Sequence, residues 1–144
     1  MFKKILCPVD FSETSINASN QAIELAEQLK STIIFIHIID INLMQNAGDL
    51  SFGSIDMYET LADEEKGLLK KLEQLATSKG IVAKTILTHG LPHEIIHETA
   101  KNESCELIVM GTHGRTGLSR VLLGSVAESI VRHTDLPVLL FRKK

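Results

Sequence analysis

The sequence predicts an α/β fold: an open parallel sheet with helices on both of its faces. Five short apolar runs alternate along the chain with stretches of helical periodicity, which is the pattern of successive βαβ units. The second run, Thr32–Ile39, is rich in β-branched residues and apolar on both faces, as expected of a buried parallel strand. A glycine-rich stretch, Gly111–Ser125, stands between the fourth apolar run and the last helical one. A strand, a glycine-rich loop and a helix start, in this order, can build an anion site from backbone N–H groups.

The first strand and the first helix have clear boundaries. Ile5–Val9 is a short apolar run that ends at Asp10. Ser12 is a candidate N-cap, and the acidic Glu13 follows it in the first helical turn. The helix itself is indicated by apolar residues at helical spacing, namely Ile16, Ile23, Ala26 and Leu29.

The rest of the chain continues the alternation of helices and strands. Asn42 to Asp56 is rich in Asn, Gly, Asp and Ser, and we expect it to form a loop. The later elements are predicted as a helix over Met57–Ser78 with Gly80 at its C′ position, a strand over Ile81–Leu87, a helix beginning at Pro92, a strand over Glu106–Met110, a helix over Ser125–His133 and a strand over Val138–Phe141.

Length and composition favour one globular domain spanning residues 1–144. The net charge of −3 and the aromatic content of 4% argue against a surface for nucleic acid or for an anionic membrane. No apolar run approaches the roughly 20 residues that a membrane span needs, and the first residues lack the features of a signal peptide. We therefore expect a cytoplasmic protein with no nucleic-acid or membrane partner. The two cysteines, Cys7 and Cys105, are too few for a disulfide framework.

Two histidine patterns have simpler explanations than catalysis. The segment His93-Glu94-Ile95-Ile96-His97 has the zinc-peptidase spacing His-Glu-x-x-His. A metal site needs a third ligand, and the extended form of the motif would place a histidine where this chain has Glu103. Pro92 places His93 in the first turn of a short helix, so we expect His93 to lie at the surface and the segment not to be a zinc site. His37 lies within an apolar strand, which favours a satisfied interior histidine over a catalyst.

The residues of the glycine-rich stretch leave two interpretations open. Gly111, Gly114 and Gly124 could be ordinary turn glycines, or they could bring backbone N–H groups close to a phosphate. Ser125, at the start of the helix, favours a phosphate because its hydroxyl and its N–H can both reach one. Arg115 could add a charge-assisted contact to a phosphate, or it could be solvated.

Asp10 carries the same ambiguity, because it could cap the first helix or bind a ligand. In open α/β sheets, ligands bind beyond the carboxyl ends of the strands, where the direction of winding reverses. A sheet in which the first and fourth strands are neighbours would bring Asp10 and the glycine-rich stretch to the same edge.

The spacing of the glycines resembles the nucleotide-binding signature of the universal stress protein family. The signature is Gly111-x-x-Gly114, then nine residues, then Gly124-Ser125. The resemblance covers the whole chain apart from Asn42 to Asp56. It extends to the opening strand and turn, Lys4–Ser12, to the end of the second strand, His37–Asp40, to Gly90-Leu91-Pro92 and to the closing strand, Leu136–Leu140.

The resemblance implies a five-stranded parallel sheet of order 3-2-1-4-5 and the binding of ATP, with Mg²⁺ or Mn²⁺ as the accompanying cation. It implies that Asp10 holds the ribose hydroxyls. The adenine would be enclosed by Pro8, Val9, Ile38 and Met110. The ribose and phosphates would be surrounded by Gly111, His113, Gly114, Arg115, Gly124, Ser125, Val126 and Ala127. Many members carry a polar residue at one of the two positions that are Val126 and Ala127 here, so a side-chain contact to phosphate is lost in this chain.

The resemblance also implies a homodimer formed through the closing strand, Val138–Phe141, which would be an apolar edge of the sheet. We consider three functions. The first is a stress-response module that holds ATP and whose nucleotide state is read by a partner. The second is a slow metal-dependent ATPase, for which the sequence offers glycine N–H groups and arginines but no evident general base and no Walker B carboxylate. The third is a structural dimer with an empty cleft, which the intact glycine signature disfavours.

Overall fold

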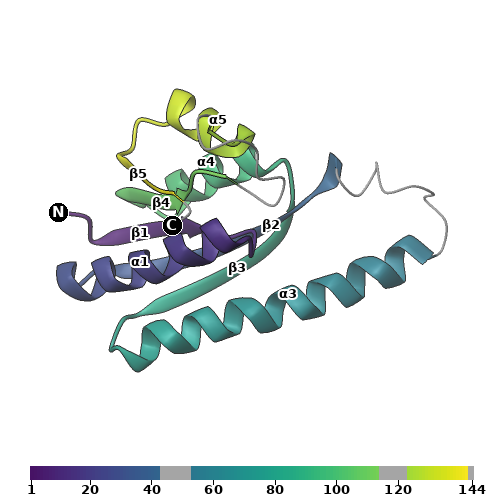
Figure 1. Cartoon of the computed structure of the whole chain (residues 1–144), viewed down its shortest axis with the longest axis horizontal. Coiled ribbons are helices and arrows are strands. Elements are labelled where there is room, and N and C mark those ends of the chain that lie inside the picture. The colour runs from purple at the N-terminus through teal and green to yellow at the C-terminus, as the bar shows by residue number, and fades with distance from the viewer. Residues whose placement is uncertain (43–52, 114–122, 143–144) are drawn as a thin grey trace.

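The computed structural model describes residues 1–42, 53–113 and 123–142. Its core is a parallel sheet of five strands in the order β3-β2-β1-β4-β5 (Figure 1). The strands are β1 (Lys4–Pro8), β2 (Thr32–Asp40), β3 (Ala83–Gly90), β4 (Leu107–Gly111) and β5 (Val138–Phe141). The predicted α/β class, the parallel sheet and the strand order 3-2-1-4-5 are all confirmed.

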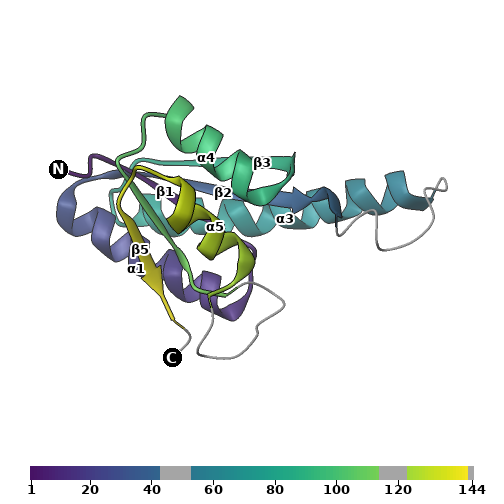
Figure 2. The same ribbon diagram turned by 90° about the horizontal axis from the view of Figure 1, so that it is seen from above.

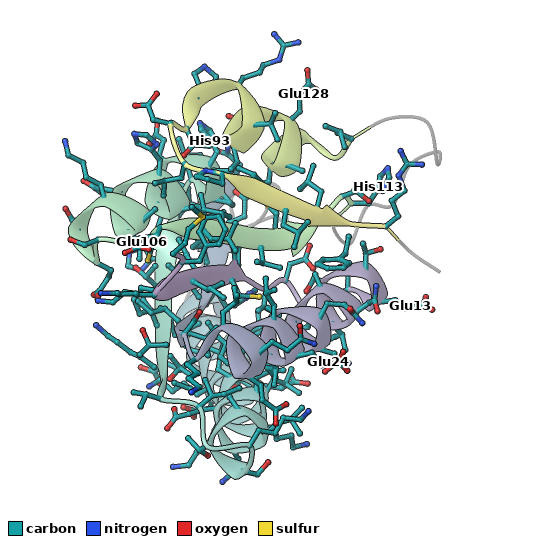
Figure 3. All side chains as sticks on the ribbon, turned by 90° about the vertical axis from the view of Figure 1, so that its left-hand side faces the viewer. Glu13, Glu24, His93, Glu106, His113 and Glu128 are labelled. Atoms are coloured by element: carbon teal, nitrogen blue, oxygen red, sulfur yellow. The ribbon has the colours of Figure 1, made fainter. Side chains whose placement is uncertain are left out.

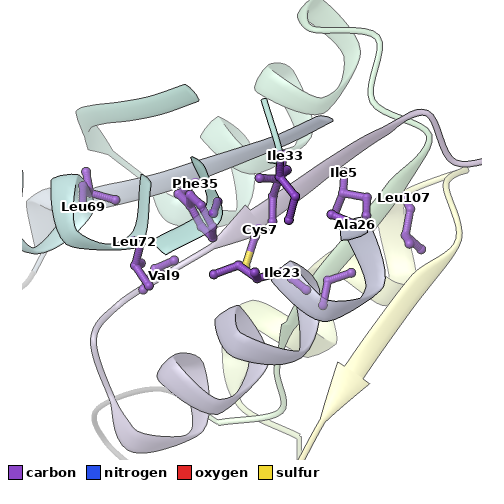
Figure 4. Packing of buried hydrophobic residues seen from close by; sticks show 14 residues of the cluster. Ile5, Cys7, Val9, Ile23, Ala26, Ile33, Phe35, Leu69, Leu72 and Leu107 are labelled. Carbon is purple, nitrogen blue, oxygen red and sulfur yellow. The ribbon is translucent and has the colours of Figure 1, made fainter. Parts of the chain in front are cut away.

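Helices cover both faces of this sheet, as the sequence predicts (Figure 2). Helices α1 (Glu13–Leu29) and α3 (Gly53–Ser78) lie on one face, and α4 (Pro92–Asn102) and α5 (Ser125–His133) lie on the other. Each pair of helices buries its own hydrophobic core against the sheet. Alternate residues of β1 belong to different cores, because side chains of a strand point to opposite faces. Ile5 and Cys7, together with Val9 just after the strand, pack under α1 and α3 (Figure 4). Leu6 packs under α4 and α5.

Two predicted elements differ from the structure by more than one residue at a boundary. Helix α3 begins at Gly53 rather than at Met57, so the predicted loop over Asn42 to Asp56 extends too far. Its first residues are poor helix formers, but once a helix is nucleated each further residue adds a hydrogen bond, and such residues are tolerated in a first turn. The remainder of that predicted loop, residues 43–52, lies outside the described residues.

The third strand is also shifted, since β3 spans Ala83–Gly90 rather than Ile81–Leu87. It pairs with β2 from Ile33, opposite Ala83, to the last residue of β2, Asp40, opposite Gly90. Pairing with the long strand β2 therefore extends β3 toward its C-terminal end. Ile81 lies just before β3 and packs into the core.

Within the part of the chain that is described, no helix is both long enough and apolar enough to cross a membrane.

The winding of the sheet reverses between β1 and β4. The chain runs from β1 outward to β2 and β3, and then returns through α4 to place β4 on the other side of β1. The carboxyl ends of β1 and β4 are therefore neighbours at the point where open α/β sheets bind ligands. The N-terminal part of α3 extends beyond this same edge (Figures 1 and 2).

Candidate functional site

The turn that follows β1 holds Asp10 in a network of short polar contacts. The Asp10 carboxylate oxygen Oδ1 accepts a hydrogen bond from the Ser12 N–H at 2.9 Å, and the Asp10 N–H donates to Ser15 Oγ at 3.1 Å. Ser12 is the N-cap of α1, and its Oγ accepts from the Ser15 N–H at 3.2 Å. The predicted cap at Ser12 is confirmed. Asp10 is therefore not the helix cap, and it stands in the turn at the carboxyl end of β1.

Gly111, the last residue of β4, lies directly against the first turn of α1. A Cβ atom at this position would be 2.9 Å from Thr14 Cγ2, 3.1 Å from the Thr14 carbonyl carbon and 3.2 Å from the Ser15 nitrogen. A side chain here would push α1 away from β4. The glycine is thus needed for close packing, which brings the turn holding Asp10 next to the end of β4.

Thr112, the residue after β4, is hydrogen-bonded both to β5 and to the N-cap of α5. Its side chain is buried, its N–H donates to the Phe141 carbonyl at 2.9 Å, and its own carbonyl accepts from the Gly124 N–H at 2.6 Å. These bonds fix the start of α5 beside the ends of β4 and β5. His113 comes next, with Nδ1 at 2.9 Å from Thr112 Oγ1, and lies at the same end of the sheet as Glu13, the first residue of α1 (Figure 3).

The N-terminus of α5 has backbone donors that the helix itself does not satisfy. Gly124 is its N-cap and has no side chain to satisfy them, and the helical ladder begins with the Glu128 N–H donating to the Gly124 carbonyl at 2.9 Å. The N–H groups of Ser125, Val126 and Ala127 therefore have no acceptor within the helix. Together with the positive end of the helix dipole, they form a suitable environment for an anion.

Apolar side chains lie on the same face of the sheet as α5. Ile38 at the end of β2, Met110 near the end of β4, and Val126 and Ala127 of α5 all belong to one hydrophobic cluster. The Val9 side chain belongs to the cluster on the opposite face, so Val9 could take part in this site only through its backbone. Pro8 is buried at the last position of β1.

The structure thus gathers most of the predicted site residues at one edge of the sheet. Gly114 and Arg115 lie outside the described residues. Ser15 and Thr112 position the two strand ends through their polar contacts, and neither is among the residues predicted for the site. A signal for each exists in the sequence: Ser15 follows the N-cap Ser12 by three residues, and Thr112 stands between Gly111 and His113.

The His-Glu-x-x-His segment does not form a metal centre among the described residues. His93 and His97 are both exposed on α4, which confirms the predicted surface position of His93. Nowhere in residues 1–42, 53–113 and 123–142 do three or more His, Cys, Asp or Glu side chains group so that they could hold a metal ion.

Cys7 is fully buried, and burial raises the pKa of its thiol to about 12, although a hydrogen bond with Ser19 opposes the shift. It is therefore a core residue and not a nucleophile.

Comparisons with known proteins agree with this arrangement. The model of the universal stress protein family matches residues 1–142. Universal stress protein MJ0531 of Methanocaldococcus jannaschii is 36% identical over 144 residues, which cover 99% of this chain and 84% of the relative. The solved structure of protein MJ0577 from the same organism has a TM-score of 0.88 at 32% identity and covers 100% of this chain and 98% of its own. A universal stress protein of Archaeoglobus fulgidus, solved in complex with dAMP, has a TM-score of 0.66 over 98% of both chains and, at 18% identity, shares the fold.

Proposed function

The chain belongs to the universal stress protein family, and we propose that it binds ATP at the edge where β1 and β4 end. One observation carries the proposal: the winding reversal brings the turn with Asp10, after β1, to the same edge of the sheet as the end of β4, where Thr112 bonds to the N-cap of α5. Apolar side chains lie on the α5 face of the sheet near this edge. A carboxylate, unpaired N–H groups and apolar side chains are the three partners that a ribose, a phosphate chain and a flat base require.

The residues present suit each part of the nucleotide. Asp10 accepts hydrogen bonds from the ribose hydroxyls, because an ionised carboxylate has two acceptor oxygens with several lone pairs. Ile38 and Met110 contact the adenine ring. The N–H groups at the start of α5 and the Ser125 hydroxyl bind phosphate oxygens. Gly114 and Arg115 extend the phosphate site in this proposal by virtue of the family signature alone.

A known ligand of a related protein supports an adenine nucleotide. The Archaeoglobus fulgidus universal stress protein that shares this fold was solved with dAMP, which contains adenine, a sugar and a phosphate. The same three chemical groups correspond to the three sets of side chains and N–H groups at the edge of this sheet. The extension from one phosphate to three rests on the glycine signature and on the N–H groups of α5.

A divalent cation, Mg²⁺ or Mn²⁺, accompanies the nucleotide in this proposal. The described residues offer no group of three acidic, histidine or cysteine ligands. The cation is therefore held mainly by the phosphate oxygens and water, which is how Mg²⁺ usually binds with nucleotides. It would neutralise phosphate charge that the α5 N-terminus alone balances only in part.

The site is suited to holding ATP rather than to cleaving it. Hydrolysis needs a positioned water, a base or orienting group, and charge stabilisation on the transferred phosphoryl group. We assign no side chain of this site to the first two roles. The proposed function is accordingly a stress-response module of one domain, whose nucleotide-bound state is read by a partner protein.

The module acts as a homodimer in this proposal. Strand β5 is an outermost strand of the sheet, and the side chain of Leu139 within this strand is 38% exposed. An apolar edge strand with unpaired backbone groups favours pairing with a second strand, here β5 of a second copy. Sedimentation velocity tests this pairing: Leu139→Glu should convert a dimer into a monomer, and an unchanged dimer would place the interface elsewhere.

Titration calorimetry with Mg²⁺ and ATP tests the binding site. Asp10→Ala should weaken binding roughly tenfold or more, as expected for loss of a hydrogen bond to a charged group. Asp40→Ala is a matched control, because Asp40 ends the neighbouring strand β2 and accepts from the Asn42 N–H at 2.9 Å, just as Asp10 accepts from Ser12. Equal losses in both variants, or none in either, would contradict the proposed site.

A further inference from the structure

A buried polar pair lies beneath the turn that holds Asp10. His37 of β2 and Glu65 of α3 have side chains that are only 6% and 7% exposed, and His37 Nε2 lies 3.6 Å from Glu65 Oε2. Glutamate is rarely buried in this way unless it has a partner. Burial of two ionisable groups is unfavourable unless their interaction offsets the loss of hydration. Neither residue belongs to the nucleotide site described above.

His37 contacts the residues on both sides of Asp10. Its Nδ1 lies 2.6 Å from the carbonyl oxygen of Val9, and its ring centroid lies 5.0 Å from that of Phe11, with the planes inclined at 46°. Strand β1 ends at Pro8, and the Val9 N–H still donates to the Ile36 carbonyl. The His37 side chain therefore continues the connection between β1 and β2 into the turn itself.

The backbone of this turn needs such support. Phe11 has a φ of +61°, in the left-handed region that bulky L-residues seldom adopt. A strained residue of this kind persists only where its surroundings hold it in place. The aromatic contact with His37 supplies such a constraint on one side, and the bonds from Asp10 to Ser12 and Ser15 supply it on the other.

The hydrogen-bond chemistry assigns the orientation of the imidazole. A carbonyl oxygen only accepts, so His37 Nδ1 carries a hydrogen and donates it to Val9. Nε2 then faces the Glu65 carboxyl group. Nε2 and the carboxyl group attract each other only when one of them carries a proton at this contact, either Nε2 of the imidazole or an oxygen of the carboxyl group. Glu65 thus orients the ring from α3 while the ring holds the β1–α1 turn.

We propose that His37 and Glu65 are positioning residues of the nucleotide site, which hold the turn on both sides of Asp10 so that its carboxylate meets the ribose. The proposal rests on the proposed function, in which Asp10 binds the ribose hydroxyls. It adds a link from α3, on the α1 face of the sheet, to a ligand bound at the carboxyl edge. Neither side chain contacts the nucleotide.

The discrimination between ATP and 2′,3′-dideoxy-ATP tests this proposal, because it reports on the ribose contact and not on stability. The wild-type protein should bind ATP roughly 10- to 100-fold more tightly than the dideoxy analogue, as expected for hydrogen bonds to a carboxylate. His37→Leu and Glu65→Leu should reduce this ratio to less than about threefold, as Asp10→Ala does. Binding of inorganic triphosphate should change little, because the phosphate site lies at α5.

Conservative variants separate positioning from a general effect on packing. His37→Asn keeps an N–H donor near the Val9 carbonyl, and Glu65→Gln keeps a polar partner for Nε2, so both should retain most of the discrimination. Ile33→Val alters the same strand and the same core at the opposite end of β2, and it should retain the full ratio. If His37→Leu does not fold, Glu65→Gln against Glu65→Leu supplies the same comparison.

The outcomes distinguish this inference from the proposed function. A wild-type ratio that survives in folded His37→Leu and Glu65→Leu, while Asp10→Ala abolishes it, would overturn the positioning role alone. A wild-type protein that does not discriminate between the two nucleotides, or an Asp10→Ala variant that still does, would overturn the ribose contact and the positioning role with it.

Discussion

Replacing Gly111 with alanine tests how closely β4 must approach α1. The added Cβ would lie 2.9 Å from the Thr14 methyl carbon, and two backbone atoms, the Thr14 carbonyl carbon and the Ser15 nitrogen, would be at 3.1 Å and 3.2 Å. A methyl group could rotate away, but backbone atoms in the first turn of a helix can only move with the helix. The whole start of α1 must therefore shift by a few tenths of an ångström.

The expected loss of stability follows from this crowding. Overpacking of this kind destabilises by about 1–3 kcal/mol. The lower entropy of the unfolded chain with alanine offsets about 0.4–1 kcal/mol of it. We expect a net loss of about 1–2 kcal/mol, which corresponds to a decrease of roughly 3–8 °C in Tm for a chain of this length. ATP affinity should also fall, since Ser12 and Ser15, which hold Asp10, lie in the displaced turn.

Gly67→Ala is the matched control for this experiment. Gly67 lies within α3, and a Cβ atom there would meet nothing within 4 Å. Alanine stabilises a helix interior over glycine by about 0.5–1 kcal/mol, so the Tm should rise by a few degrees. Thermal unfolding followed by circular dichroism measures both variants. An increase in Tm for Gly111→Ala equal to that of Gly67→Ala would refute the close-packing argument.

Three further predictions concern the cap, the thiols and the surface histidines. Ser12→Ala removes the N-cap of α1 and should lower the free energy of unfolding by about 1 kcal/mol in denaturant titrations, whereas Ser12→Asn should restore most of it. Burial raises the pKa of Cys7 from 9.0 to about 12, so the unfolded chain alone loses this proton above pH 9. Stability should then decrease between pH 9 and 12, and less so in Cys7→Val; a pH-independent denaturation midpoint across that range would refute it. His93→Ala and His97→Ala should leave Tm and ATP affinity unchanged, because both side chains are exposed on α4, and a loss of either property would assign them a role.

The sequence predicted the elements that local chemistry determines. Ser12 could be identified as a cap from its position after a strand and before a helical pattern, and the structure confirms it. The parallel sheet follows from alternating patterns, but the position of β4 beside β1 came from the family signature. Strand order depends on long-range packing, for which periodicity along the chain carries no information.

The parts that the sequence did not predict depend on tertiary contacts. The left-handed backbone at Phe11 has no local signal, because it is held by His37 from another strand. The side chain of Val9 lies on the α1 face, as its alternation with Ile5 and Cys7 indicates, whereas the family resemblance implies that Val9 contacts the adenine. In the sequence, Glu65 is one of many charged residues of an amphipathic helix. Only its buried contact with His37 of β2 distinguishes it from the other charged residues of that helix.

Identification of a nucleotide that copurifies with the protein tests the central claim most directly. The purified protein is denatured, and the released small molecules are separated by ion-exchange chromatography and identified by mass spectrometry. The account predicts an adenine nucleotide, with ATP as the main species, and a clear decrease of its amount in Asp10→Ala but not in Asp40→Ala. Absence of any adenine nucleotide, together with no heat of binding when ATP and Mg²⁺ are added, would contradict it.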